Sequence, residues 1–481
     1  MPDATVSPLS HWIDGRARPG ASGQCLEVHS PVDGALVSRV ALGDQADVDT
    51  AARAAEDAVA GWAALAPRER GEVLFAIERG LRAEPASLAA LEQAETGKPP
   101  GLIRDELAAS ADYFGFYASL ARTLGGETFD VGPERHVYTV HEPYGVVAVI
   151  TPWNYSVNQV ARSVAPALAA GNAVVVKPSE WTSSAVLAFA ELASAAGLPD
   201  GVLNVVTGDG PHTGAALVAH PLVRRVTFTG SLAGGREVAR HAAARLIPIT
   251  LELGGKSPHV VFADADLERA VTVISDELLV NTGQTCSAGT RLLVQRPVHD
   301  ELLEAVTARV GASRPGAELG PIITEAQYRR VGEYFAVAAA EGAVATIGGA
   351  TARDPSLARG RFVEPTVYAG VRSDMRIARE EVFGPVLTVS AFDHERDGIA
   401  IANDSRYGLA AGVWTRDLSR GLRVAHALQS GQVYVNGWGA PIEAPFGGYK
   451  DSGYGREKGR AAIAEYTQVK TISVAIAPAC P

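Results

Sequence analysis

Hydrophobic positions recur with a helical period near the start of the chain. Between residues 45 and 124, apolar side chains return at spacings of three and four, which places them on one face of a helix. The clearest run is Val48, Ala51, Ala55, Val59 and Trp62. This segment is therefore predicted to form amphipathic helices that bury one face in a core.

From residue 145 onward the pattern changes to short β-branched runs that alternate with alanine-rich helical segments. These runs cover residues 146–150, 173–176, 202–206 and 225–228. Strands that alternate with helices predict parallel strands joined by helical crossovers, as in a doubly wound, Rossmann-like α/β domain with a nucleotide site at its strand ends. A second alternating block, from about residue 251 to residue 451, predicts a second α/β domain.

Two polar segments alternate apolar and polar residues as exposed strands do. They cover residues 125–142 and 466–475, and such strands leave hydrogen-bonding edges that a partner must cover. The 481 residues also exceed what one hydrophobic core accommodates. We therefore predict a cofactor domain at 1–124 and 143–252, a catalytic domain at 253–451, and a small β oligomerisation element at 125–142 and 452–481.

Composition and charge argue against several classes of protein function. The net charge of −11 supplies no basic surface for phosphates, so nucleic-acid binding is disfavoured. No apolar stretch reaches the roughly 18 residues that cross a bilayer, and the N-terminus lacks a secretory pattern, so a cytoplasmic enzyme without membrane contact is expected. Cys25, Cys286 and Cys480 are far apart, which predicts neither a disulfide framework nor a metal site.

Cys286 is the first candidate for chemistry. It lies in NTGQTCSAGTR, residues 281–291, among small and polar residues. A single cysteine is more often a small packed side chain than a nucleophile. Glu252 in LELGGKSP, at the end of an apolar strand, is either a solvated carboxylate or a general base. Together the two residues indicate covalent catalysis followed by hydrolysis.

Polar residues follow several of the predicted strands. Asn154 in TPWNYS is either a turn former or an amide donor that stabilises an oxyanion. Lys177 and Glu180 in VVVKPSE form either a surface ion pair or a site for ribose hydroxyls. Gly230 and Ser231 in FTGSLAGG lie between a strand and a helix, so free backbone N–H groups face an incoming pyrophosphate, although the spacing is not GxGxxG.

Seven motifs occur in a fixed order along the chain. They are TPWN, KPSE, FTGS, LELGGKSP, GQTC, EEVFGPV at 380–386 and PFGGYKDSGYGRE at 445–457. In these motifs and their order the sequence resembles the aldehyde dehydrogenase superfamily of the NAD(P)-dependent, hydrolytic type. The resemblance implies oxidation of a small-molecule aldehyde to a carboxylic acid with NAD, by a homodimer or homotetramer.

The resemblance also implies catalytic roles. Cys286 corresponds to the nucleophile, which forms a thiohemiacetal and then a thioester, and Glu252 to the general base. Asn154 and the backbone N–H of Cys286 correspond to the oxyanion hole. No histidine lies near Cys286 in the sequence, so Glu252 is also a candidate for activating the thiol. Relatives that release the acyl group to coenzyme A lack this glutamate, and a non-catalytic relative has no reason to keep all three residues.

Eight residues correspond to the NAD site. They are Trp153, Lys177, Glu180, Gly230, Ser231, Gly235, Glu381 and Phe383. Lys177 and Glu180 match the pair on the adenosine ribose, and Glu381 with Phe383 matches the nicotinamide ribose and ring. The other four match the path of the phosphates.

Two positions of this site bear on cofactor choice. Glu180 favours NAD because a carboxylate accepts a hydrogen bond from the 2′-hydroxyl and repels a 2′-phosphate, although some relatives with this glutamate also use NADP. Gly234 stands where relatives often have a bulky apolar residue, next to Gly235. Looser packing around adenine is therefore expected.

The sequence constrains the substrate less. Tyr155 and Trp438 resemble aromatic residues of the aldehyde tunnel, and Trp438 is similar to a tryptophan of enzymes that act on aminoaldehydes. Arg162 lies where relatives acting on succinic semialdehyde bind a carboxylate, but Val280 replaces their second arginine. Alternatively, Arg162 makes a structural ion pair on its helix. A broad or uncharged aldehyde is the default, beside a semialdehyde acid or an aminoaldehyde.

Overall fold

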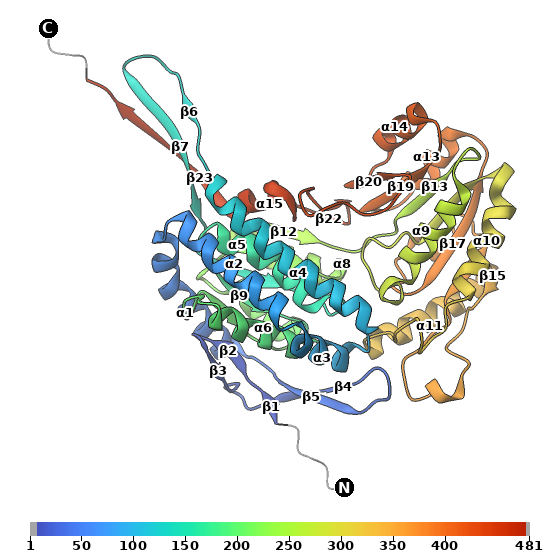
Figure 1. Ribbon diagram of the computed structural model, residues 1–481, viewed down its shortest axis with the longest axis horizontal. Helices are drawn as coiled ribbons and strands as arrows, with labels where there is room; N and C mark the ends of the chain where they lie inside the picture. Colours follow the sequence, from blue (N-terminus) through green and yellow to red (C-terminus); the bar gives the residue numbers. More distant parts are fainter. Residues whose placement is uncertain (1–6, 478–481) are drawn as a thin grey trace.

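The computed structural model describes residues 7–477 and arranges them as two α/β units, with a narrow sheet projecting from the first (Figure 1). Cys480 and the rest of 478–481, like residues 1–6, lie outside the described part of the chain. No helix between residues 7 and 477 is long and apolar enough to cross a membrane. Over the same residues, His, Cys, Asp and Glu side chains form no group of three that suits a metal ion.

The helices predicted between residues 45 and 124 are confirmed. They are α1 (Gln45–Ala64), α2 (Pro67–Ala83), α3 (Pro85–Thr96) and α4 (Pro100–Leu120). The Asp44 carboxylate accepts hydrogen bonds from the first-turn N–H groups of α1, and the Asp47 carboxylate accepts one from the Asp44 N–H. This reciprocal cap satisfies N–H groups that have no partner within the helix and so fixes where α1 begins.

An eight-stranded sheet forms the centre of the first unit. Its order is β22 (Gly453–Tyr454), β12 (Ile249–Glu252), β11 (Val223–Thr229), β8 (Val146–Ile150), β9 (Ala173–Lys177), β10 (Leu203–Val205), β2 (His11–Ile13) and β3 (Arg16–Arg18). The five strands from β12 to β10 run parallel, which confirms the predicted doubly wound domain.

Helices cover both faces of this sheet (Figure 1). They are α1 to α4, α5 (Ser156–Ala169), α6 (Ser184–Ala195), α7 (Ala215–Ala219) and α8 (Leu232–Arg245). Strand β8 directs Val147 and Val149 into the core shared with α4, α5 and α6, and its alternate residues into the core shared with α1, α7 and α8. Because successive side chains alternate in direction, a strand buried on both faces is apolar throughout.

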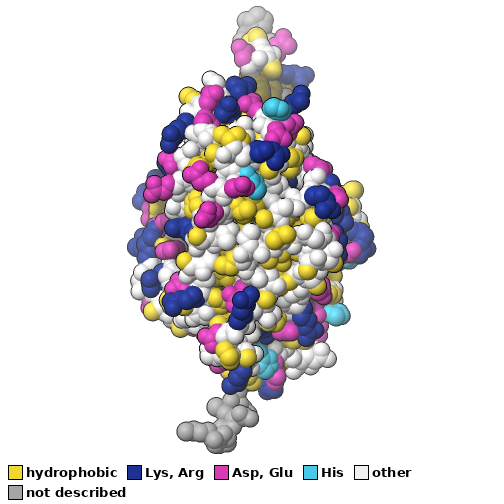
Figure 2. Space-filling view, turned by 90° about the vertical axis from the view of Figure 1, so that its right-hand side faces the viewer, with side chains coloured by type: hydrophobic (Ala, Val, Ile, Leu, Met, Phe, Trp, Pro, Cys, Tyr) yellow, Lys and Arg dark blue, Asp and Glu magenta, His cyan; other side chains and the backbone are white. Residues whose placement is uncertain are grey.

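A seven-stranded sheet forms the second unit and confirms the predicted second α/β domain. Its order is β15 (Val344–Ile347), β16 (Thr366–Ala369), β17 (Val386–Phe392), β14 (Arg291–Gln295), β13 (Pro258–Val261), β19 (Ala410–Trp414) and β20 (Gln432–Val435). The helices around it are α9 (Leu267–Leu279), α10 (His299–Gly311), α11 (Glu325–Ala340), α13 (Glu395–Asn403) and α14 (Leu418–Ala427). Acidic and basic side chains are interspersed over the outer face of this unit (Figure 2).

The projecting sheet has the order β23 (Thr467–Ala475), β7 (Arg135–Pro143) and β6 (Thr128–Phe129). β23 and β7 pair antiparallel along their full length, so the two segments predicted to be exposed strands are partners of each other. Residues 453–465 belong elsewhere, although the predicted division groups them with the tail. β22 pairs with β12, and α15 (Gly459–Glu465) contacts α5, so both pack on the first unit.

Candidate active site

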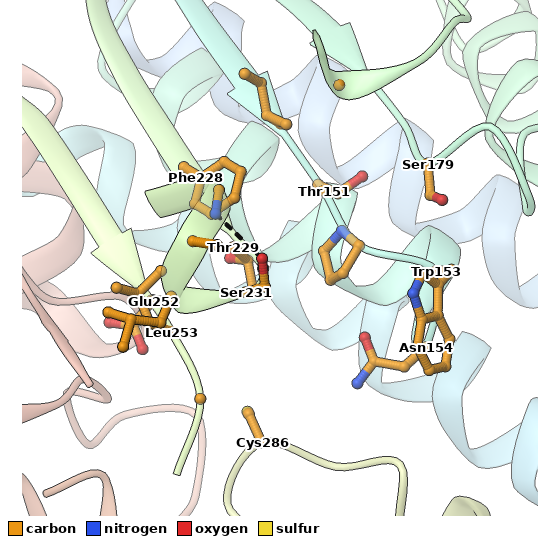
Figure 3. Close-up of a pocket in the computed structure, with 18 of the residues that line it drawn as sticks. Thr151, Trp153, Asn154, Ser179, Phe228, Thr229, Ser231, Glu252, Leu253 and Cys286 are labelled. Atoms are coloured by element: carbon orange, nitrogen blue, oxygen red, sulfur yellow. Dashed lines mark hydrogen bonds between the residues drawn. The ribbon is translucent and has the colours of Figure 1, made fainter. Parts of the chain in front are cut away.

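A cavity of about 680 Å³ lies between the two units, at the carboxyl ends of β8, β9, β11 and β12 (Figure 3). Ligands bind at this edge of doubly wound sheets because strand ends and helix N-termini meet there. The sequence-predicted residues that line it are Trp153, Asn154, Lys177, Glu180, Gly230, Ser231, Glu252, Cys286, Glu381 and Phe383. Residues from segments far apart in the chain therefore share one space.

Asn154 follows β8 and is fixed to the segment that carries Cys286. Its side-chain Nδ2 donates to the Gln284 carbonyl at 2.9 Å, and Asn281 Nδ2 donates to the Asn154 carbonyl at 3.0 Å. Among the described residues, one N–H of the Asn154 amide thus has no acceptor, and the amide lies toward Cys286 across the cavity (Figure 3). A rigid, uncharged donor in this position suits the stabilisation of an oxyanion.

The loop that carries Cys286 runs from the short helix η3 (Val280–Gly283) to β14. The Gln284 side chain is fully buried; it donates to the Asn281 and Pro321 carbonyls and accepts from the Ile323 N–H. Gly283 has φ 70°, and a Cβ there would lie 2.3 Å from the Gly384 backbone. The small and polar residues around Cys286 therefore serve a tightly packed loop that presents the thiol to the cavity.

Glu252 is the last residue of β12 and is 2% exposed. Neither of its carboxylate oxygens has a hydrogen-bond partner among residues 7–477. Arg162 on α5 lies nearby, with Nη2 at 3.7 Å from Glu252 Oε2, and Arg162 also pairs with Glu457. The Glu457 carboxylate accepts a further hydrogen bond from Ser163 Oγ at 2.9 Å. One buried arginine thus bridges two carboxylates beside the cavity.

Burial controls the protonation of this cluster. It raises the pKa of the Cys286 thiol to about 11, an effect that Arg162 opposes and Glu252 reinforces. It also raises the pKa of Glu252 well above its ordinary value, and again Arg162 opposes the shift. At neutral pH the thiol therefore keeps its proton, and its conversion to a nucleophile requires a neighbouring base.

The N-terminus of α8 forms the phosphate-facing part of the cavity. Ser231 is the N-cap residue, and its Oγ accepts from the Gly234 N–H at 3.1 Å. The remaining first-turn N–H groups suit a pyrophosphate. The sequence placed Gly235 at this turn, but Gly235 packs on Leu253, where a Cβ would lie 2.6 Å from Cδ2, whereas Gly234 lines the cavity. The small residue at 235 therefore serves the packing of α8 on β12.

The ring of Phe228 fills the space beside Gly234. A Cβ on Gly234 would lie 2.9 Å from Phe228 Cζ, and one on Gly230 would lie 2.7 Å from the same atom. The looser packing around adenine that the sequence predicts at Gly234 stays a prediction. The ring of Phe228 supplies apolar surface beside this glycine.

Lys177 and Glu180 lie at and just beyond the end of β9, at the edge of the cavity. Lys177 Nζ is 3.6 Å from Glu180 Oε2, and both residues line the cavity. Burial lowers the pKa of Lys177, and Glu180 opposes this shift. The pair offers one donor and one acceptor to adjacent hydroxyls, as the adenosine ribose requires. Together with the α8 turn, these residues fit a dinucleotide.

Glu381, Phe383 and Trp153 form the opposite end of the cavity. The Trp153 and Phe383 rings meet edge to face at a centroid distance of 5.4 Å. The Glu381 carboxylate accepts from the Gly255 N–H at 3.0 Å, and burial raises its pKa to about 7. This end combines an aromatic wall with an acceptor, which suits a ring joined to a ribose.

The three predicted substrate residues lie in different surroundings. Tyr155 Oη is 3.0 Å from Thr285 Oγ1, next to Cys286, and the Lys98 ammonium lies 4.8 Å from the Tyr155 ring centroid. Trp438 lines a second cavity of about 180 Å³. Arg162 lines neither cavity, and its partners are Glu252, Glu457 and the Phe446 ring at 4.5 Å. Its ion pairs therefore reach other elements, not its own helix as the alternative interpretation had it.

Sequence reasoning did not single out Glu457, Ser163, Glu277 and Lys458. Glu457 is the last residue of the motif PFGGYKDSGYGRE, so its place in the motif could have identified it. Its partners, however, lie 294 and 295 positions earlier in the chain. Lys458 follows directly after the motif, and Glu277 resembles an ordinary polar residue of a helix. Only packing places these residues beside the cavities.

Comparisons with known proteins agree on one family. A sequence model described as the aldehyde dehydrogenase family matches residues 18–472. A provisionally assigned aldehyde dehydrogenase from Burkholderia cenocepacia is 43% identical over 97% of this chain and 99% of its own, with a TM-score of 0.95. HpcC from Thermus thermophilus is 39% identical over 99% and 95%, with a TM-score of 0.96. Betaine aldehyde dehydrogenase from Staphylococcus aureus, solved with NAD+, is 36% identical over 99% and 96%, with a TM-score of 0.95.

Proposed function

Because the chain belongs to the aldehyde dehydrogenase family and oxidises an aldehyde with NAD, we propose that Cys286 is the nucleophile of this reaction and that a carboxylic acid is released by hydrolysis. The observation that supports this most directly is the meeting of Cys286, Asn154 and Glu252 around one cavity. Glu252 also favours water over coenzyme A as the acyl acceptor, because a carboxylate beside the thiol activates water.

In the proposed mechanism, Cys286 Sγ forms a bond to the aldehyde carbon as the thiol proton passes to a base. The free N–H of Asn154 and the backbone N–H of Cys286 stabilise the oxyanion of the thiohemiacetal. Bound NAD supplies the acceptor for the hydride that leaves this carbon. Glu252 then takes a proton from water, water attacks the resulting thioester, and the carbon–sulfur bond breaks to release the acid and restore the thiol.

We propose that the predicted domains have separate roles, with residues 453–465 assigned to the first unit on which they pack. The first unit, with the α8 turn, Lys177 and Glu180, holds the cofactor, and the second unit, with the Cys286 loop, carries the nucleophile. Glu381 and Phe383 hold the nicotinamide end, and Trp153, Gly230 and Ser231 line the path of the phosphates. A catalytic thiol must stay reduced, which supports a cytoplasmic location.

Glu180 should set a preference for NAD over NADP. We expect a higher kcat/KM with NAD, and in Glu180→Ala the preference should fall roughly tenfold to a hundredfold, since a hydrogen bond to a charged group contributes about 1.5–3 kcal/mol. Steady-state kinetics with both cofactors measure this ratio. Glu191→Ala, at an exposed position on α6, is the matched control and should keep the parental ratio. A parent enzyme that prefers NADP would contradict the assignment.

We propose that the projecting sheet joins subunits into a homodimer or homotetramer. β23 is an edge strand, so one side of its backbone lacks a strand partner over nine residues within the described chain. Val469 and Val474 on this strand are 61% and 46% exposed. Such an edge is a surface that another strand covers.

Light scattering at micromolar concentration should give two or four times the chain mass of 50.1 kDa. The double variant Val469→Lys, Val474→Lys should lower the measured mass, because charge on an edge strand opposes pairing. Val344→Lys, at a 62% exposed position on β15, is the control and should leave the mass unchanged. A parent protein that scatters as a single chain would refute the proposal.

A further inference from the structure

A second cavity, of about 180 Å³, adjoins the Cys286 loop and is used by none of the steps above. Its walls include Ser287, the residue next to Cys286, together with Glu277, Gln432, Tyr434, Trp438 and Lys458. We call it the Trp438 cavity. Ser287 lines it and the adjacent Cys286 lines the larger cavity, so the Cys286 loop borders both spaces. An aldehyde that reaches Cys286 from this side leaves its distal end in the Trp438 cavity.

Lys458 is a cation without a counter-ion in this cavity. Within residues 7–477 its ammonium makes no ion pair and no hydrogen bond, and its contact is with the Phe446 ring, 5.3 Å from Nζ to the centroid. Burial lowers the pKa of Lys458 to about 8, with a smaller contribution in the same direction from Arg162, while Cys286, Glu457 and Glu252 oppose the shift without forming an ion pair with the ammonium. A desolvated ammonium is costly unless an anion accompanies it.

The backbone fixes the direction of this lysine. Lys458 has φ 58° and ψ 172°, a region that is costly for a residue with a side chain. Backbone hydrogen bonds fix both of its neighbours, Glu457 and Gly459, to the segment 442–446. Phe446 and Glu457 exchange two backbone hydrogen bonds, at 2.6 and 2.8 Å, and the Gly459 N–H donates to the Ile442 carbonyl at 2.8 Å. The fold thus keeps Lys458 in a strained conformation whose side chain lines the cavity, which indicates a use for its charge.

Arg162 is not available to pair with an anion in the Trp438 cavity, because two carboxylates already accompany its positive charge. It pairs with Glu252 and Glu457 and lines neither cavity. Glu277, the acidic residue of the Trp438 cavity, is not within ion-pair distance of Lys458, and burial raises its pKa to about 7. Near neutral pH a large part of Glu277 is therefore uncharged and does not cancel the positive charge of Lys458.

We propose that the Trp438 cavity binds the carboxylate of a short aldehyde acid, with the Lys458 ammonium as its ionic partner. This inference rests on the proposed attack of Cys286 on the aldehyde and adds the class of substrate. The aromatic walls at Tyr434 and Trp438 contact the apolar chain between the two functional groups. The carboxylate then replaces the missing counter-ion of Lys458, and the carbonyl lies at Cys286.

The test compares three aldehydes of equal chain length with full-length enzyme and saturating NAD: one neutral, one with an ω-carboxylate and one with an ω-amino group. The parent should show its highest kcat/KM with the ω-carboxylate. In Lys458→Met, which keeps the length but not the charge, kcat/KM for that substrate should fall roughly tenfold to a hundredfold, mainly through KM. The neutral aldehyde should lose far less, and Lys458→Arg should restore most of the loss.

Lys450→Met is the matched control, because Lys450 also has a positive φ, of 52°, but lines neither cavity. It should keep the parental ratio of the three substrates. Equal losses on the neutral and ω-carboxylate aldehydes in Lys458→Met would overturn the inference while leaving aldehyde oxidation intact. A parental preference for the ω-amino aldehyde that Glu277→Gln abolishes would overturn it too, in favour of a cation site.

A binding measurement separates the inference from the proposed function. Glutarate, a short dicarboxylate, should slow alkylation of Cys286 by iodoacetamide in the parent and not in Lys458→Met. This readout needs no turnover, so it holds even if none of the three aldehydes is oxidised. Equal protection in both proteins would overturn the role of Lys458.

Discussion

Replacing Cys286 by alanine is expected to abolish NADH formation, with a loss of roughly 10⁴-fold or more, because no thioester can form without Sγ. Binding of NAD should change little, since Cys286 is not among the residues proposed to hold it, and Lys177, Glu180 and the α8 turn lie on the first unit. NADH absorbance measures the first effect, and calorimetric titration with NAD measures the second. Together the two measurements on Cys286→Ala distinguish the loss of the catalytic step from the loss of NAD binding.

Cys25→Ala is the control for this experiment. Cys25 is an exposed cysteine on strand β4 (Cys25–His29), away from the cavities, and its removal should leave turnover at the parental level. If Cys286→Ala keeps more than a trace of dehydrogenase activity, Cys286 is not the nucleophile. If the variant loses NAD binding as well, the Cys286 loop contributes to the cofactor site.

The second large effect is expected from Glu252→Gln, which should lower steady-state turnover by roughly 10²- to 10⁴-fold. The amide cannot take the proton of the attacking water, so the thioester accumulates. Formation of the thioester precedes this step, and rapid mixing should therefore still show a burst of NADH close to one per active site. Stopped-flow absorbance records the burst and the slow phase together.

Glu237→Gln is the matched control, at an exposed glutamate of α8, and should leave both phases unchanged. Parental turnover in Glu252→Gln would require another base. Loss of the burst would have a different meaning, because burial raises the pKa of the Cys286 thiol to about 11. In that case Glu252 also removes the thiol proton in the first half-reaction.

The buried cluster around Arg162 explains why Glu252 can act as a base at all. Burial alone keeps a carboxyl protonated, since it raises the pKa of Glu252 well above its ordinary value. The positive charge of Arg162, 3.7 Å away, favours the carboxylate form that accepts a proton. Glu457 pairs with the same guanidinium and therefore shares its positive charge with Glu252.

Local patterns in the sequence determined the architecture and most of the candidate site. Continuous β-branched runs such as 146–150 predicted strands buried on both faces, and the spacing of apolar residues after Gln45 predicted helices, because both periods are properties of short segments. The motifs identified Cys286, Glu252 and Asn154, since each follows a strand or lies in a loop whose composition differs from that of a core. These conclusions required no knowledge of distant contacts.

Only the tertiary structure decided which charges meet. Arg162 matched a carboxylate-binding residue of relatives, but Glu457, 295 positions further along the chain, occupies its guanidinium. Gly235 matched a phosphate-facing turn, but Leu253 packs against it and Gly234 faces the cavity. Lys458 carries no sequence signal, because its freedom from a partner is a property of everything packed around it. Desolvation and pairing depend on groups that the chain brings together only when it folds, and for this reason the substrate end of the site cannot be derived from the order of the residues.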